Sequence, residues 1–315
     1  MREKNFRTRF CTGRFTFPAL FAVVAVLLLF GHWQDLARWG GVVAVGATAV
    51  LLAELNDRYA LLRERSDLPS VVFLLLAAAT PSLWSWTVAT VPMLALLVAY
   101  FLLLSTYQQR EVSAQTFHVG FFFGLSALVY PPIVCLLPAV FLALTANLRA
   151  LTLRSFSSLI IGALFPTWLA AAWAIWKGSL PELLARVADA FRFAQPDYGS
   201  LTVAEIVVSA ACIVLSLFAA VHFFRTSYSD KIRIRQFFNV FILFEVFLAA
   251  ALALQPQQID VLLPLLLLNS SNIIARHLIS AKGRLANIWF YVSLLVLAGA
   301  IVYNFFIWNQ SQTLS

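Results

Sequence analysis

The sequence predicts an all-α, polytopic integral membrane protein. Hydrophobic residues make up 62% of the 315 residues and charged residues only 11%, against roughly a quarter charged in a soluble domain. The apolar residues form long runs, and the charged residues lie in short segments between them. Helices satisfy all their backbone groups internally, as the bilayer requires. We therefore expect residues 1–315 to form a single integral membrane domain.

The positive charge is arranged as in membrane proteins and not as in nucleic-acid-binding proteins. The formal net charge is +8, but the basic residues occur in short segments that separate apolar runs. This pattern is typical of membrane topology, and it does not form a continuous groove that tracks phosphates. We expect a lipid bilayer, and no nucleic acid, as partner.

Eleven apolar runs are candidate membrane spans. They cover residues 17–30, 41–55, 68–86, 87–106, 117–130, 131–145, 156–176, 201–224, 237–254, 259–274 and 286–308. A nine-span alternative, in which residues 68–106 and 117–145 each cross once, stays open. We favour eleven because Pro81 and the cluster Trp84-Ser85-Trp86 interrupt the first of these two stretches.

Residues 117–145 contain the clearest structural signal, a Tyr130-Pro131-Pro132 break. As one straight helix the stretch would be about 43 Å long, against a hydrocarbon core of roughly 30 Å. Both prolines lack an amide donor, and Pro131 disfavours helical angles at Tyr130. We expect two short helices that meet at a corner.

The distribution of basic residues predicts the orientation. With residues 1–16 as a basic cytoplasmic N-terminus, eighteen of the 22 basic residues fall on the inner side. The outer side keeps Arg38, Lys177, Arg186 and Arg192. The positive-inside rule then predicts a cytoplasmic N-terminus. Residues 177–200 carry apolar residues at helical spacing, which predicts an amphipathic segment on the outer interface.

The histidines and cysteines do not predict a metal site. The chain has no HExxH pair and no paired CxxC spacing. Of the four histidines, His32 falls outside and His118, His222 and His277 fall at inner ends of spans. The inner three are either interfacial polar side chains or a group that converges in space. We predict no metal, and the sequence identifies no cofactor.

The polar segment between the first two runs is the best candidate site. It contains His32, Trp33, Asp35, Arg38 and Trp39. Such a group can form a polar site beside the bilayer, or it is a solvated turn between two interfacial tryptophans. The outer residues predicted to join the site are Tyr130, Arg192 and Asp260.

Glu245 is a carboxylate in the middle of the apolar run FILFEVFLAA. A carboxyl group at this depth is expensive unless it is protonated or paired. It therefore indicates a functional intramembrane residue, or one that satisfies a polar group of another span.

The order of several segments resembles a known family. These segments are AELNDRYALLRERSDLPSVVFLLLAAATPS, GFFFGLSALVYPPIVCLLPAVFLAL, LRSFSSLIIGALFPTWLAAAW and QIDVLLPLLLLNSSNIIA. They resemble an uncharacterised family of polytopic inner-membrane proteins from Bacteroidota, whose members often carry a carotene-monooxygenase label. A membrane-embedded carotene dioxygenase needs clustered histidines, which the predicted topology does not supply.

The middle of the chain also looks like the membrane core of GT-C glycosyltransferases, which use lipid-linked sugars. Gly120, Gly124 and Leu125 match a G-x-x-x-G-L helix, Tyr130-Pro131 a proline corner, and Leu68-Pro69 an "LP" entry to a span. Those enzymes keep an essential carboxylate in the first external loop. The matching loop here holds Asp35, but it is far shorter and lacks a carboxylate pair.

Three functions follow as expectations. A GT-C-like enzyme would build lipid-linked envelope glycans from a polyprenyl-phosphate-linked sugar, with Asp35 as base or metal-supported carboxylate. Arg38 and Arg192 would hold the lipid phosphate, and His32, Tyr130 and Asp260 would contribute to substrate binding. A non-catalytic membrane subunit would use the same loops to contact other membrane proteins. A transporter would use Glu245.

Overall fold

The structure is a computed structural model that describes residues 13, 15–29, 33–62, 66–109, 111–190, 196–280, 295, 298, 299 and 301–303. Within these residues the chain is helical and contains no strand. The described chain forms two compact units. Unit 1 comprises the described parts of 1–87, 199–230 and 266–315, and unit 2 those of 88–198 and 231–265.

Helices of unit 1 correspond to the predicted runs. They are α2 (Thr16–Leu29), α3 (Leu36–Tyr59), α4 (Leu68–Ala78), the short η1 (Pro81–Leu83), α10 (Val203–Thr226), η5 (Ser227–Ser229) and the second part of α12 (Ile259–Ser280). The helices α3 and α12 are longer than the predicted runs, and α4 is shorter.

Unit 2 contains the predicted corner and the amphipathic segment. Its helices are α5 (Thr90–Ser105), α6 (Ser113–Val129), η2 (Pro131–Leu136), α7 (Leu137–Leu142), the π-helical turn η3 (Ala143–Asn147), α8 (Leu153–Lys177), α9 (Leu180–Ala190), α11 (Ile232–Leu254), η6 (Pro256–Gln258) and the start of α12. The turn η4 (Tyr198–Ser200) lies where the two units divide.

Five helices of the described chain are long and apolar enough to cross a membrane: α3, α8, α10, α11 and α12 with η6. Five shorter apolar segments correspond to the runs that begin near Phe17, Leu68, Thr87, Phe117 and Pro131. The run 286–308 lies almost wholly outside the described residues. The structure therefore confirms an all-helical chain in the described residues, and its long apolar helices fit a multi-pass membrane protein. The count of about eleven crossings and the single domain stay predictions.

The chain reverses direction at the Tyr-Pro-Pro corner. The helix α6 ends at Val129, and η2 begins directly at Pro131. After η2, α7 and η3, the amide of Gln108 donates to the carbonyl of Leu148 at 2.9 Å. Because Gln108 lies just before α6, the segment after the corner has returned to where α6 begins. The predicted pair of helices that meet at a corner is thus confirmed.

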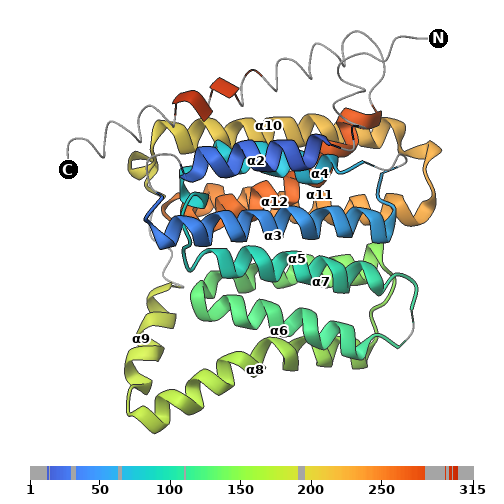
Figure 1. Ribbon diagram of the computed structural model, residues 1–315. Coiled ribbons are helices and arrows are strands. Elements are labelled where there is room, and N and C mark those ends of the chain that lie inside the picture. Colours follow the sequence, from blue (N-terminus) through green and yellow to red (C-terminus); the bar gives the residue numbers. More distant parts are fainter. Residues whose placement is uncertain are drawn as a thin grey trace, which may run out of the picture. The chain divides into compact units, whose positions relative to one another are not determined.

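The helix α6 packs closely against the first half of α8 (Figure 1). A Cβ atom on Gly120 would lie 2.1 Å from the carbonyl oxygen of Leu159, and one on Gly162 would lie 2.1 Å from that of Phe117. Gly124 faces the carbonyl oxygen of Ala163 in the same way. Small residues that let backbones touch are the usual basis of helix association in lipid.

Local capping explains where several helices begin and end. Thr152 with Ser155 and Thr202 with Glu205 form capping boxes at the starts of α8 and α10, which satisfy amides left over in the first turn. Gly178 ends α8 in the left-handed conformation with φ +70°.

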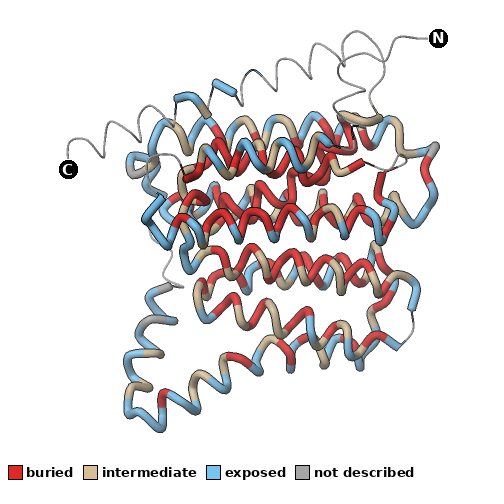
Figure 2. Tube along the Cα trace, viewed as in Figure 1, coloured by how far each residue is buried: buried red, intermediate tan, exposed pale blue. Residues whose placement is uncertain are grey.

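The outer surface of unit 2 is apolar along α8. Large exposed side chains include Ile161, Leu164, Trp168, Trp173 and Trp176, and Figure 2 shows exposed turns along much of α8 and α9. Such a face is stable beside lipid tails. The predicted amphipathic segment forms the helix α9 and contacts η2.

Candidate functional site

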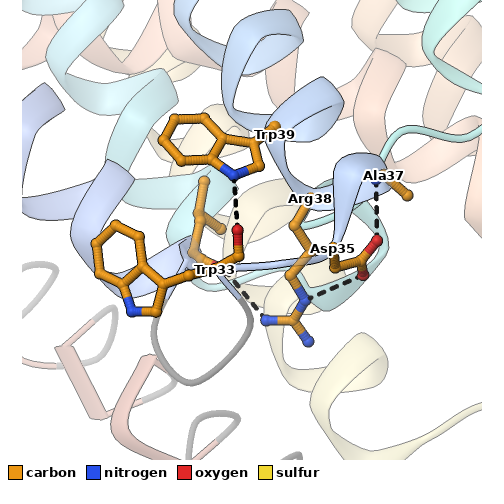
Figure 3. Close-up of polar contacts among 6 residues, drawn as sticks. Trp33, Asp35, Ala37, Arg38 and Trp39 are labelled. Atoms are coloured by element: carbon orange, nitrogen blue, oxygen red, sulfur yellow. Dashed lines mark hydrogen bonds and ion pairs between the residues drawn. The ribbon is translucent and has the colours of Figure 1, made fainter.

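Asp35 is the N-cap of α3. Its Oδ1 accepts a hydrogen bond from the Ala37 amide at 2.9 Å (Figure 3). This bond satisfies one of the amides that the first helical turn leaves without an intrahelical partner. The side chain is nevertheless 46% exposed, so the carboxylate stays accessible from outside the protein.

Arg38 is directed inward and joins two helices. It is only 4% exposed, and its Nη1 donates to the carbonyl oxygen of Leu28 at 3.1 Å, near the end of α2. Its Nε lies 3.9 Å from Asp35 Oδ2 (Figure 3). The guanidinium therefore connects the end of α2 to the start of α3, and these contacts compete with the predicted binding of a lipid phosphate.

The two tryptophans complete this short connection. Trp39 Nε1 donates to the Trp33 carbonyl at 3.0 Å (Figure 3), and their ring centroids are 6.4 Å apart. His32 lies outside the described residues. Of the predicted group, the structure brings Asp35, Arg38, Trp33 and Trp39 together as a closed turn between α2 and α3.

Tyr130 lines an apolar cavity of about 280 Å³ in unit 2, which we call the corner cavity. Its lining comes mainly from η2 and the last turns of α11: Tyr130, Pro132, Ile133, Cys135, Leu136, Phe247, Ala250, Ala251, Leu254, Gln255 and Leu262. Tyr130 Oη donates to Gln255 Oε1 at 2.7 Å. The lining contains no charged side chain.

The remaining predicted residues of the site are Asp260 and Arg192. Asp260 is exposed in the first turn of α12, in unit 2, and Arg192 lies outside the described residues. Asp35 and Arg38 belong to unit 1, whereas Tyr130 and Asp260 belong to unit 2. A shared outer site of Asp35, Tyr130 and Asp260 stays a prediction.

Glu245 is buried in α11, as its position in the sequence indicates, and is 8% exposed. It interacts electrostatically with Tyr100 of α5, which is fully buried. The Tyr100 ring packs edge-on against Phe241 and Phe244, with centroids 5.0 and 5.3 Å apart. The ring contacts of Tyr100 thus join α5 and α11 in the neighbourhood of this carboxyl group.

A second polar group, which the sequence analysis missed, lies between α10 and α12 in unit 1. Arg276 forms a buried ion pair with Asp230, and its Cζ lies 4.9 Å from the centroid of the Phe223 ring. The rings of His222 and His277 meet edge-to-face with centroids 4.6 Å apart. Two of the three inner histidines thus converge in space, while His118 belongs to unit 2.

Next to this group, α12 carries four buried polar residues in a row, Asn269, Ser270, Ser271 and Asn272. Ser271 Oγ and Asn272 Nδ2 both donate to the Leu268 carbonyl, at 2.7 and 3.2 Å. Polar residues at membrane depth usually face the protein interior and mark functional positions. Their run inside the apolar segment 259–274 was the signal that could have found this group.

In the described part of the chain, no group of three or more His, Cys, Asp or Glu side chains is arranged to hold a metal ion. No protein-family model, curated protein or solved structure matches the chain.

Proposed function

We propose that this protein is a multi-pass inner-membrane protein that serves as a non-catalytic subunit in the assembly of lipid-linked envelope glycans. The observation that supports this proposal is the turn at Asp35, where the polar groups hold α2 and α3 together. Asp35 caps α3, and Arg38 is buried against the Leu28 carbonyl. With these contacts, the first outer loop has a structural role that requires no chemistry.

The proposal includes the expected topology of about eleven spans with a cytoplasmic N-terminus. It also includes membership of the Bacteroidota family that the sequence resembles. The exposed apolar face of α8 would contact lipid or the spans of another membrane protein. Such a subunit would bring a membrane partner and its lipid-linked substrate together.

A second candidate is the GT-C-like glycosyltransferase itself. It is favoured by the 46% exposure of the Asp35 side chain, which leaves the carboxylate able to meet a polyprenyl-phosphate-linked sugar. In that case Asp35 would act as general base on the acceptor hydroxyl, a role that contributes roughly 10²–10⁴-fold to a rate.

Replacement of Asp35 separates the two candidates. Asp35→Asn preserves the N-cap, since Asn and Asp cap helices about equally well, whereas Asp35→Ala removes it at a cost of about 1 kcal/mol in the free energy of unfolding. For a subunit, we expect Asp35→Asn to restore envelope glycan and lipid-linked precursor levels fully in a deletion strain, at equal protein abundance.

The Asp35→Ala variant is the control for stability, because it removes both the cap and the carboxylate. If Asp35→Asn is folded and abundant but glycan synthesis falls by roughly 10²-fold or more, Asp35 acts as a base. The glycosyltransferase then replaces the subunit as the better proposal.

The orientation can be tested with single cysteines in a chain that lacks Cys11, Cys135 and Cys212. In intact cells, cysteines at positions 229 and 280 should resist a membrane-impermeant thiol reagent, and one at position 179 should react. The physical reason is the excess of basic residues on the inner side. The opposite labelling pattern would mean that the segments predicted on the inner side lie on the outer side, and the reverse.

A further inference from the structure

The corner cavity is apolar but has one polar edge. Tyr130 Oη donates to Gln255 Oε1 at 2.7 Å, and this bond orients the amide so that Oε1 faces the tyrosine. The Gln255 nitrogen, Nε2, keeps its two N–H donors. In the described part of the chain, no acceptor takes a hydrogen bond from this nitrogen, although Gln255 lines the cavity. A ligand here would gain a hydrogen bond by offering an acceptor oxygen.

The polar edge of the corner cavity lies at the end of α11. The cavity is lined by Phe247, Ala250, Ala251 and Leu254, which belong to the last two turns of a candidate membrane span. Gln255 is the residue that ends this helix. The apolar part of the cavity thus lies inside the span, and the amide lies where the span ends. Hydrocarbon gives way to the polar interface at that level of a bilayer.

A phospholipid in a bilayer has the same order of apolar and polar parts as this cavity. Its acyl chains lie in the hydrocarbon, and its ester carbonyls lie at the boundary between hydrocarbon and headgroups. We propose that the corner cavity binds one acyl chain of a membrane phospholipid, whose ester carbonyl accepts a hydrogen bond from Gln255 Nε2. The second chain and the headgroup stay in the bilayer. This proposal does not depend on the function proposed above.

Two observations favour an acyl chain over a polyprenyl phosphate. The volume of about 280 Å³ lies just below the roughly 300–1,000 Å³ range of ligand sites, so the cavity accommodates part of one acyl chain and not a long branched one. The lining has no charged side chain to bind a phosphate, whereas a neutral amide donor matches a neutral carbonyl.

The first test measures the phospholipid that stays with the full-length protein after purification in mild detergent, by mass spectrometry. We expect about one phospholipid per chain, and its loss in Ala251→Phe, because the larger ring fills the cavity. Val246→Phe is the matched control, since Val246 lies on α11, is exposed and does not line the cavity. Gln255→Leu should lower retention roughly two- to tenfold, the range expected for one neutral hydrogen bond.

The second test needs no substitution and therefore does not depend on the stability of a variant. The protein in vesicles is exposed to a phospholipid with a photoreactive acyl chain or to a photoreactive polyprenyl phosphate. We expect the acyl probe to label peptides with residues 132–136 and 247–254, and addition of unlabelled phospholipid to reduce the labelling. A preference for the polyprenyl probe at these peptides would overturn the assignment. Equal lipid retention in Ala251→Phe and Val246→Phe would overturn the site.

Discussion

Gly120→Ala should destabilise the packing of α6 on α8 by about 3 kcal/mol or more, beyond the usual cost of overpacking a core. The new methyl group would lie 2.1 Å from the backbone carbonyl of Leu159. A side chain can rotate away from such a contact, but a helix backbone cannot, so the two helices must separate. Gly162→Ala should have a similar effect, because its Cβ meets the Phe117 carbonyl at 2.1 Å. Unfolding in mixed detergent micelles measures both effects.

Two other glycines provide graded controls. At Gly299 an added Cβ meets nothing within 4 Å, so Gly299→Ala should be neutral or slightly stabilising through helix propensity. At Gly46 the nearest atoms, at 2.8 and 2.9 Å, belong to the ring of Phe21, which can move, so Gly46→Ala should cost less than Gly120→Ala. If Gly120→Ala is no more destabilising than Gly299→Ala, the close contact of α6 and α8 is wrong.

The corner and the helices around it were predictable because their signals are local. The two prolines at 131 and 132 act on the backbone angles and amides of neighbouring residues. The apolar runs likewise give helices by their length. In the sequence, the motif Gly120-x-x-x-Gly124 carries a resemblance to the GT-C enzymes and does not by itself identify a partner helix. The structure gives it a packing role against α8.

The candidate site was only partly predictable. The grouping of Asp35 with Arg38 follows from their spacing of three residues, and an Asp just before an apolar run is also a typical N-cap signal. The direction of the Arg38 side chain, toward the Leu28 carbonyl, depends on how α2 and α3 pack. No spacing rule gives that direction, so the sequence alone left Arg38 free to bind phosphate.

The buried ion pair of Asp230 with Arg276 could not be derived from the sequence. Asp230 and Arg276 are 46 positions apart, and each lies at the edge of an apolar run where a solvated charge is the ordinary expectation. Only the tertiary arrangement shows that both side chains are buried. The contact between the His222 and His277 rings also depends on the tertiary arrangement. The sequence allowed either separate interfacial side chains or a group of histidines that converges in space.

Asp230→Ala should destabilise unit 1 by about 3–5 kcal/mol, because removing one partner leaves the other charge buried without its counterion. Asp230 and Arg276 are both nearly fully buried, with side chains 1% and 5% exposed. Arg276→Met should cost about as much, since it leaves the Asp230 carboxylate buried while the methionine keeps the contact of the stem with Phe223. The free energy of unfolding in mixed micelles is again the measurement.

The double variant Asp230→Ala with Arg276→Met measures the energetic coupling between the two residues. An apolar pair of similar volume removes both desolvation costs, so the double variant should be more stable than either single variant. Arg225→Ala, at an exposed position near the end of α10, should change stability by no more than about 0.5 kcal/mol. If the two single effects simply add in the double variant, Asp230 and Arg276 are not energetically coupled, and the buried ion pair does not hold the connection after α10 to α12.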